Sequence, residues 1–185
     1  MRKIVTIVLL LTGTMSAFAQ SEENKAGRIF KKFKVDVSLG YAKPQTTGTD
    51  GGALFAIEPK YAVTDQIAIG LRSEVAVTVK IDKVGDESKA KGNLSYILTG
   101  DYYFSDKKFR PFGGLGAGIY TFASVDSDTQ LNSAADLPTD SKFGFMARAG
   151  FEYGHLRFGV EYNFVDNKAG YLGLKLGACI GGGRK

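Results

Sequence analysis

Hydrophobic and polar residues alternate along most of the chain from Phe33 onward. Between residues 67 and 81 the odd positions are apolar except for Ser73, whereas the even positions include Arg72, Glu74 and Lys80. A period of two places successive side chains on opposite faces of a β-strand, while a helix would repeat every 3.6 residues. The pattern therefore predicts strands with one apolar face and one charged face.

Eight segments show this pattern, at residues 33–42, 53–62, 67–81, 94–104, 110–123, 142–153, 156–165 and 171–180. The connections between them alternate between longer ones (43–52, 82–92, 124–141, 166–170) and short ones (63–66, 105–109, 154–155). Such alternation is typical of an up-and-down barrel with short turns at one end and longer loops at the other. We predict an all-β fold, an eight-stranded antiparallel up-and-down barrel.

The size of the residues predicts which face points outward. Phe and Tyr rings lie on the apolar face, whereas the charged face carries many of the glycines. The narrow interior of eight strands needs small residues beside long ones, and a lipid-facing surface accepts any number of rings. The apolar face should therefore contact lipid in a transmembrane barrel. Aromatic residues near the strand ends are predicted to form interfacial girdles: Phe33, Tyr41, Tyr61, Tyr102, Phe104, Tyr153, Tyr162, Phe164 and Tyr171.

Charges of both signs are predicted to point into the lumen. The basic residues are Lys34, Lys60, Arg72, Lys80, Arg110, Arg148, Arg157 and Lys175, and the acidic residues are Asp36, Glu58, Glu74, Asp101, Glu152 and Glu161. Buried charges must be paired or hydrated, and these two sets nearly balance. We therefore favour a structural network of ion pairs that fills the lumen over a charge-selective pore.

Composition and the N-terminus narrow the class of protein further. One Cys and one His provide neither an internal disulfide nor a structural zinc site. Arg2 and Lys3, the apolar run 4–11 and Ala17-Phe18-Ala19 have the order of a signal peptide cleaved after Ala19. We expect a signal peptide at 1–19, a periplasmic lead-in at 20–32 and the barrel at 33–185. The net charge of +5 forms no basic stripe with interleaved aromatics, so nucleic-acid binding is not expected.

Several motifs, in this order, resemble the small eight-stranded outer-membrane barrels of Gram-negative bacteria, in the broad OmpA/OmpX/OmpW-like sense. They are Glu58 to Asp65 (EPKYAVTD), Ile67 to Leu71 (IAIGL), Asp101 to Phe104 (DYYF) and Arg110 to Gly118 (RPFGGLGAG). The resemblance covers nearly all of 33–180. It implies a location in the outer membrane, a periplasmic N-terminus, long loops at the cell surface, and insertion by the barrel-assembly machinery. It further implies a porin-like, monomeric scaffold that contacts outer-membrane lipid and lipopolysaccharide, without a cofactor.

Residues with catalytic chemistry are few. His155 is predicted in an exposed two-residue turn, Cys179 is expected to be structural, and the carboxylates Glu74, Glu152 and Glu161 could act as acid/base groups but have basic neighbours. The glycines of 113–118 precede no helix, so they do not form a phosphate loop. We predict no catalytic residues and no metal ligands in the barrel.

The loop 124–141 is acidic, with Asp126, Asp128, Asp136 and Asp140 and no Lys or Arg. It is predicted to be a solvated surface loop, with a divalent-cation site or a contact for a basic partner as the alternative. We expect a non-enzymatic protein that supports envelope integrity or surface interaction through its loops. The alternative is a conduit for small solutes or hydrophobic molecules.

Overall fold

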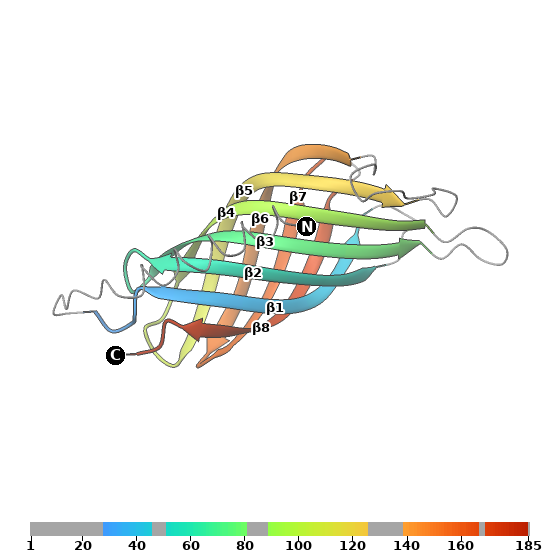
Figure 1. Cartoon of the computed structure of the whole chain (residues 1–185). Helices are drawn as coiled ribbons and strands as arrows, with labels where there is room; N and C mark the ends of the chain where they lie inside the picture. The colour runs from blue at the N-terminus through green and yellow to red at the C-terminus, as the bar shows by residue number, and fades with distance from the viewer. Residues whose placement is uncertain (1–27, 46–50, 81–88, 126–138, 167–168, 185) are drawn as a thin grey trace, which may run out of the picture.

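Eight strands form one closed sheet in the computed structural model, which describes residues 28–45, 51–80, 89–125, 139–166 and 169–184. The strands are β1 (Phe33–Pro44), β2 (Gly52–Ala62), β3 (Ile67–Lys80), β4 (Lys89–Tyr103), β5 (Phe109–Val125), β6 (Thr139–Tyr153), β7 (Leu156–Phe164) and β8 (Tyr171–Gly181). Each strand pairs antiparallel with the next, and β8 pairs with β1 to close the barrel (Figure 1). The predicted all-β, eight-stranded barrel is confirmed.

The predicted signal peptide at 1–19 lies outside the described residues, as does most of the predicted lead-in. In the part of the chain that the structure describes, no helix is long and apolar enough to cross a membrane.

Strand boundaries differ from the prediction mainly at the end of the barrel that carries the longer connections. Strand β4 begins at Lys89 rather than 94, and β6 begins at Thr139 rather than 142. The added residues are largely polar, so the alternation of apolar positions does not reveal them. They are nevertheless in strand conformation because the ladders continue there. Lys80 on β3 pairs with Lys89 on β4, and Ala123 on β5 pairs with Thr139 on β6.

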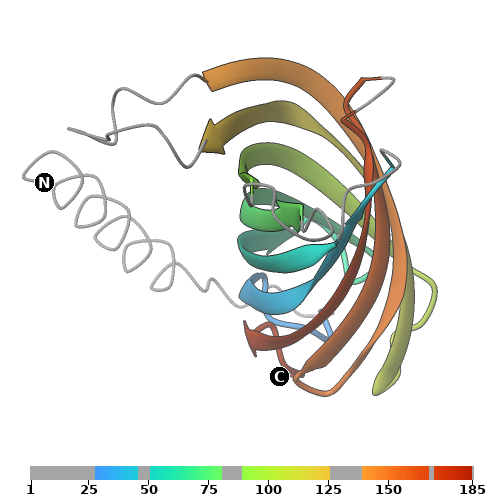
Figure 2. The same cartoon turned by 90° about the vertical axis from the view of Figure 1, so that its right-hand side faces the viewer.

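The two ends of the barrel differ. We call the end with the short turns 63–66, 104–108 and 154–155 the terminal end, because β1 begins there and β8 ends there, and the opposite end the loop end. The 154–155 turn is tight, with Tyr153 paired to Leu156, and Gly154 has a φ of 63° that side-chain-bearing residues rarely adopt. At the loop end β6 is paired with β7 only from Phe145 onward, so β5 and β6 extend beyond β7 (Figure 2).

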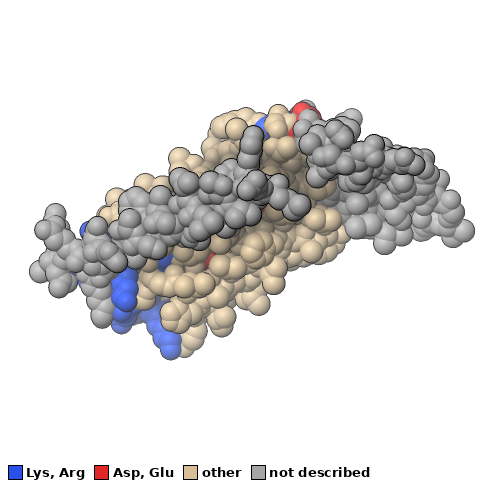
Figure 3. All heavy atoms as spheres, in the orientation of Figure 1, with Lys and Arg blue, Asp and Glu red and all other residues tan. Residues whose placement is uncertain are grey.

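The outer face of the barrel is apolar. Leu39, Leu98, Leu115 and Leu176 are 62–70% exposed, as expected for side chains that contact lipid rather than a protein core. The flank in Figure 3 is correspondingly tan, and Lys and Arg gather at the terminal end. The girdle prediction is wrong for Tyr171, which is 5% exposed and lies inside the barrel, because it has the same parity on β8 as the inward Gly173 and Lys175.

Candidate functional site in the barrel lumen

The charged residues assigned to the lumen from the sequence are placed inside the barrel, where all are buried or nearly so. They are Lys34, Asp36, Glu58, Lys60, Arg72, Glu74, Asp101, Arg110, Arg148, Glu152, Arg157, Glu161 and Lys175. Alternation brings them together, because one face of each two-faced strand turns inward when the sheet closes. The side chain of Lys80 lies outside the described part of the chain.

Arg148 makes the most ordered contacts in the lumen. Its two terminal nitrogens donate to the two carboxylate oxygens of Glu58 at 2.8 and 2.7 Å, and its Nε donates to Oδ1 of Asp101 at 2.8 Å. This two-pronged geometry matches the planar guanidinium to a carboxylate. Gly114 makes room for it, since a Cβ there would lie 2.2 Å from Oδ1 of Asp101.

The pairs around Arg148 extend into a larger group. Lys60 lies 2.7 Å from both Asp36 and Asp101, and Arg157 donates to Asp101 at 2.9 Å. Lys34 and Arg157 both bind Glu152, whose Oε1 also accepts the Tyr103 hydroxyl at 2.8 Å. We call these eight residues, four basic and four acidic, the terminal-side cluster: Lys34, Asp36, Glu58, Lys60, Asp101, Arg148, Glu152 and Arg157. Arg110 lies at its edge, 3.8 Å from Glu152.

A second group lies nearer the loop end. Arg72 binds Glu161 and donates to the Asn163 amide oxygen at 3.1 Å, while Lys175 binds Glu74 and lies 2.9 Å from Glu161. Two tyrosine hydroxyls complete the group. That of Tyr171 donates a hydrogen bond to Glu74 at 2.5 Å, and that of Tyr120 donates one to the amide oxygen of Asn163 at 2.7 Å. This loop-side cluster also balances, with Arg72 and Lys175 against Glu74 and Glu161.

The space between the two clusters is small. A cavity of about 30 Å³ lies between the two clusters, lined by residues of both, and it has room for only a few water molecules. Beyond the loop-side cluster a layer of buried apolar and aromatic side chains crosses the interior: Ala42, Leu54, Ala76, Ile97, Tyr120, Val165 and Tyr171. Between the terminal-side cluster and the apolar layer, side chains therefore occupy most of the described lumen.

Residues 28–32, which we call the strap, cover the terminal end of the lumen. The amide nitrogens of Ile29 and Phe30 donate to the Asp65 carboxylate at 3.3 and 3.1 Å, and Lys31 donates to the carbonyl of Gly183 at 3.1 Å. The strap thus binds the β2–β3 turn on one side and the C-terminal tail on the other.

Phe30 is the central contact of the strap. It is 7% exposed, and the Arg110 guanidinium on β5 lies 3.9 Å from its ring centroid and 4.1 Å from that of Tyr103. Arg110 also donates to the carbonyl of Asp65 at 2.7 Å, so a cation held between two rings joins the strap to the opposite side of the mouth.

The remaining candidate residues offer little catalytic or metal-binding chemistry. His155 is exposed in its turn, and its Nδ1 lies 2.9 Å from the carbonyl of Cys179. Asp36, Glu152 and the buried Cys179 bring potential ligand atoms within 4.8 Å of one another, but Lys34, Lys60 and Arg157 already neutralise the two carboxylates. A cation would have to displace these ammonium and guanidinium groups.

The acidic loop is shorter than predicted. Asp126, Asp128 and Asp136 lie outside the described residues, but Asp140 belongs to strand β6 rather than to a loop. Its carboxylate lies 3.4 Å from Lys142, which also binds Asp166 at 2.9 Å. The prediction missed this strand residue because the ladder to β5 continues where the apolar alternation has ended.

Sequence reasoning did not find several residues of the lumen. Tyr103, Tyr120, Thr99 and Asn163 bind the clusters, and the strap belongs to the segment 20–32, which is predicted only as a lead-in. A signal for the tyrosines was available, because Tyr103 shares the parity of Asp101, and Tyr120 that of the inward glycines 114–118. A ring on the charged parity indicates an inward hydroxyl with a charged partner.

The strap leads to a prediction about Cys179, the only cysteine of the chain, which is 4% exposed and lies beside Asp36 and Glu152. Replacing Phe30→Gly should raise the rate at which a charged thiol reagent modifies Cys179 in the folded barrel. Losing even half of the about 3 kcal/mol that a buried ring contributes raises the open population by about tenfold. Mass spectrometry of the labelled protein measures the rate.

The matched control is Phe104→Gly. Phe104 is at the same end of the barrel but is 67% exposed on the outside. Its removal should leave the labelling rate unchanged. Equal rates in the wild type and Phe30→Gly would show that the strap does not restrict access.

Comparison with known proteins agrees with this architecture. The model of the outer membrane protein beta-barrel domain matches residues 5–178. Among solved structures, the chain is similar to neisserial surface protein A, with a TM-score of 0.61 and 16% identity over 82% of this chain and 98% of that one. The outer membrane protein OprG of Pseudomonas aeruginosa gives 0.51 and 16% over 85% and 100%. The N-terminal barrel of OprF from the same organism gives 0.50 and 14% over 82% and 99%.

At these identities the structural matches show the fold alone. No curated protein sequence matches the chain.

Proposed function

Because the chain belongs to the outer membrane protein beta-barrel domain family, we propose that it is a closed, non-enzymatic barrel that presents surface loops and conducts no solute through its lumen. The terminal end faces the periplasm, and the loop end faces the cell surface, where lipopolysaccharide surrounds it. The chain is inserted as a monomer by the barrel-assembly machinery. Its location in the outer membrane follows from the family.

The filled lumen is the observation that carries this proposal. A hydrated ion needs a continuous aqueous path, but the space between the two clusters holds only a few water molecules. The apolar layer around Ile97 and Tyr120, both 0% exposed, crosses the lumen toward the loop end. The strap covers the lumen at the terminal end. Each inward carboxylate of the clusters is engaged by a Lys or Arg, which supports a structural rather than a catalytic role.

Planar-bilayer recording on the refolded protein tests closure. We expect no steady conductance steps, because opening a path would require several buried ion pairs to separate at once. A characterised porin, inserted under the same conditions, shows that the bilayer is able to report conductance. Stable ion-selective steps from this chain would reject the closed barrel and favour the conduit.

The second part of the proposal assigns surface interaction to the loops. The outer face is committed to lipid and the inner face to ion pairs, so the loop-end connections are the segments free to meet a partner. Replacing residues 126–138 with a short Gly/Ser linker should leave insertion intact, because closing a shorter loop costs little. In cells that lack the native chain, this variant should insert normally but fail to restore detergent resistance or adhesion. Full restoration would show that these residues do not carry the function.

A further inference from the structure

Two stretches of the chain share one pattern of two lysines, a phenylalanine and another basic residue. They are Lys31-Lys32-Phe33-Lys34 and Lys107-Lys108-Phe109-Arg110. The first leads into β1 and the second into β5. In a closed barrel with its strands in sequential order, β1 and β5 are four strands apart in either direction. The two copies of the pattern therefore lie on opposite sides of the terminal end.

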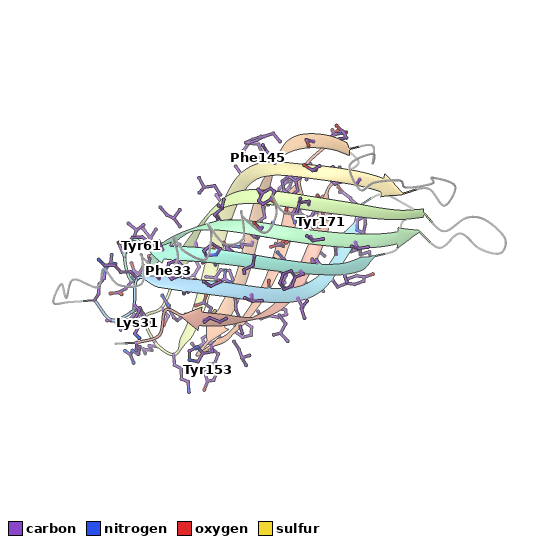
Figure 4. All side chains as sticks on the ribbon, viewed as in Figure 1. Lys31, Phe33, Tyr61, Phe145, Tyr153 and Tyr171 are labelled. Atoms are coloured by element: carbon purple, nitrogen blue, oxygen red, sulfur yellow. The ribbon has the colours of Figure 1, made fainter. Side chains whose placement is uncertain are left out.

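The two phenylalanines have the same neighbour on the outer face. Phe33 is opposite Tyr61 in the ladder of β1 and β2, and Phe109 is opposite Tyr153 in the ladder of β5 and β6. Tyr61 and Tyr153 are 49% and 50% exposed. Figure 4 shows Lys31, Phe33 and Tyr61 together at the terminal end. Each copy thus places an outward Phe–Tyr pair directly beside its lysines.

Backbone hydrogen bonds fix both lysine pairs. The amide nitrogen of Ala62 donates to the carbonyl of Lys32 at 2.7 Å, and that of Gly154 donates to the carbonyl of Lys108 at 3.3 Å. The end of β2 therefore holds Lys32 in the first copy, and the turn between β6 and β7 holds Lys108 in the second. The lysines extend from a rigid rim and not from a free tail.

The fourth residue of each copy turns into the lumen and leaves the two lysines outside. Lys34 and Arg110 both lie over the Tyr103 ring, at 5.0 and 4.1 Å from its centroid. Lys31, Lys107 and Lys108 are exposed, and Lys32 is half-buried. The Lys108 ammonium lies 4.9 Å from the Tyr153 ring centroid, which places the charge at the depth of the aromatic girdle.

In the described part of the terminal end, acidic side chains do not cancel this charge. Of the two aspartates in the described turns of the terminal end, Asp65 accepts the strap's amide hydrogens, and Asp106 is a single exposed carboxylate beside Lys107 and Lys108. Arg28 and Arg184 add further positive charge there. The blue spheres at this end in Figure 3 show the excess.

We propose that the terminal end carries two equivalent sites for the headgroup of an anionic phospholipid. One site consists of Lys31, Lys32, Phe33 and Tyr61, and the other of Lys107, Lys108, Phe109 and Tyr153. The ammonium groups bind the lipid phosphate, the tyrosine hydroxyl donates a hydrogen bond at headgroup depth, and the phenylalanine ring contacts the upper acyl chains. The inference rests on the proposed orientation, which puts this end in the phospholipid leaflet, but not on the closed lumen.

Native mass spectrometry of the refolded chain from mixed micelles tests the sites. With equal amounts of phosphatidylglycerol and phosphatidylcholine, the wild type should retain two molecules of phosphatidylglycerol. Lys31→Gln/Lys32→Gln and Lys107→Gln/Lys108→Gln should each retain one, and the quadruple variant none. Each lysine near a lipid phosphate contributes about fivefold in affinity, so losing a pair weakens a site by about 25-fold.

The control variant is Lys43→Gln, which removes an exposed lysine near the loop end of β1 and should retain two lipids. Gel mobility before and after boiling checks that every variant is folded. Inorganic phosphate at matched ionic strength should not displace the lipid; displacement would mean that the sites bind free phosphate, and would overturn the proposal. Unchanged retention in the quadruple variant, or equal loss in Lys43→Gln, would also overturn it. A conducting barrel that retains two lipids would instead reject only the closed lumen.

Discussion

The Arg148→Met variant should lose about 3–5 kcal/mol of folding free energy, the range for breaking a buried ion pair by removing one partner. The loss is large because Arg148 satisfies both oxygens of Glu58 and one of Asp101, which are 4% and 2% exposed. The methionine fills much of the space but donates no hydrogen bond. Urea unfolding of the variant in lipid vesicles, followed by gel mobility, measures the change.

Two further variants show whether the unpaired carboxylate causes the loss. Adding Glu58→Gln to Arg148→Met should recover part of the stability, because a neutral amide costs less to bury than an unpaired charge. Lys142→Met removes a cation from the exposed pair with Asp166 and should lose far less, since water and salt already screen that pair. A stability loss in Arg148→Met no greater than in Lys142→Met would contradict the network as described.

The Val75→Arg variant should lose about 2–4 kcal/mol, the cost of a basic residue on the lipid face near the middle of the bilayer. Val75 is 45% exposed near the middle of β3, and its ladder partners are Phe55 on β2 and Leu94 on β4, both on the outer face. A long cation there has to extend toward water at the cost of its packing. Unfolding in vesicles of defined thickness gives the free energy.

Ile67→Arg is the matched control for depth. Ile67 begins β3 opposite Tyr102 of the terminal-end girdle, so an arginine there reaches the headgroups and should cost about 0–1 kcal/mol. If Val75→Arg were as stable as Ile67→Arg, the assignment of odd positions of β3 to lipid would be wrong.

The sequence predicts the barrel well because lipid enforces a strict rule. Positions that face lipid are mostly apolar and every backbone group must pair within the sheet, so a period of two is visible in each strand. The same rule explains where the prediction stops. At Lys89–Asn93 and Thr139–Ser141 the strands continue beyond the apolar band, and only hydrogen bonding to the neighbouring strand maintains them.

Parity also identifies which charges enter the lumen, but not which cation binds which anion. Arg148 on β6 binds Glu58 on β2, across the barrel, and this choice depends on side-chain reach and on the space left by Gly114. The error for Tyr171 arose from position alone, since a ring at a strand end was assigned to the girdle without regard to its parity. The strap is invisible to pattern reasoning because no strand or helix period marks its contacts, which are hydrogen bonds of Arg28 and of backbone amides together with one buried ring.

The exact balance within each cluster has a consequence for how the barrel responds to voltage. An electric field across the membrane does work on a moving group in proportion to its net charge, about 2.3 kcal/mol per elementary charge per 100 mV. Four basic side chains move with four acidic ones in the terminal-side cluster, and two with two in the loop-side cluster. Displacing either cluster as a unit transfers no net charge. A membrane potential therefore does little net work on a rigid displacement of either cluster.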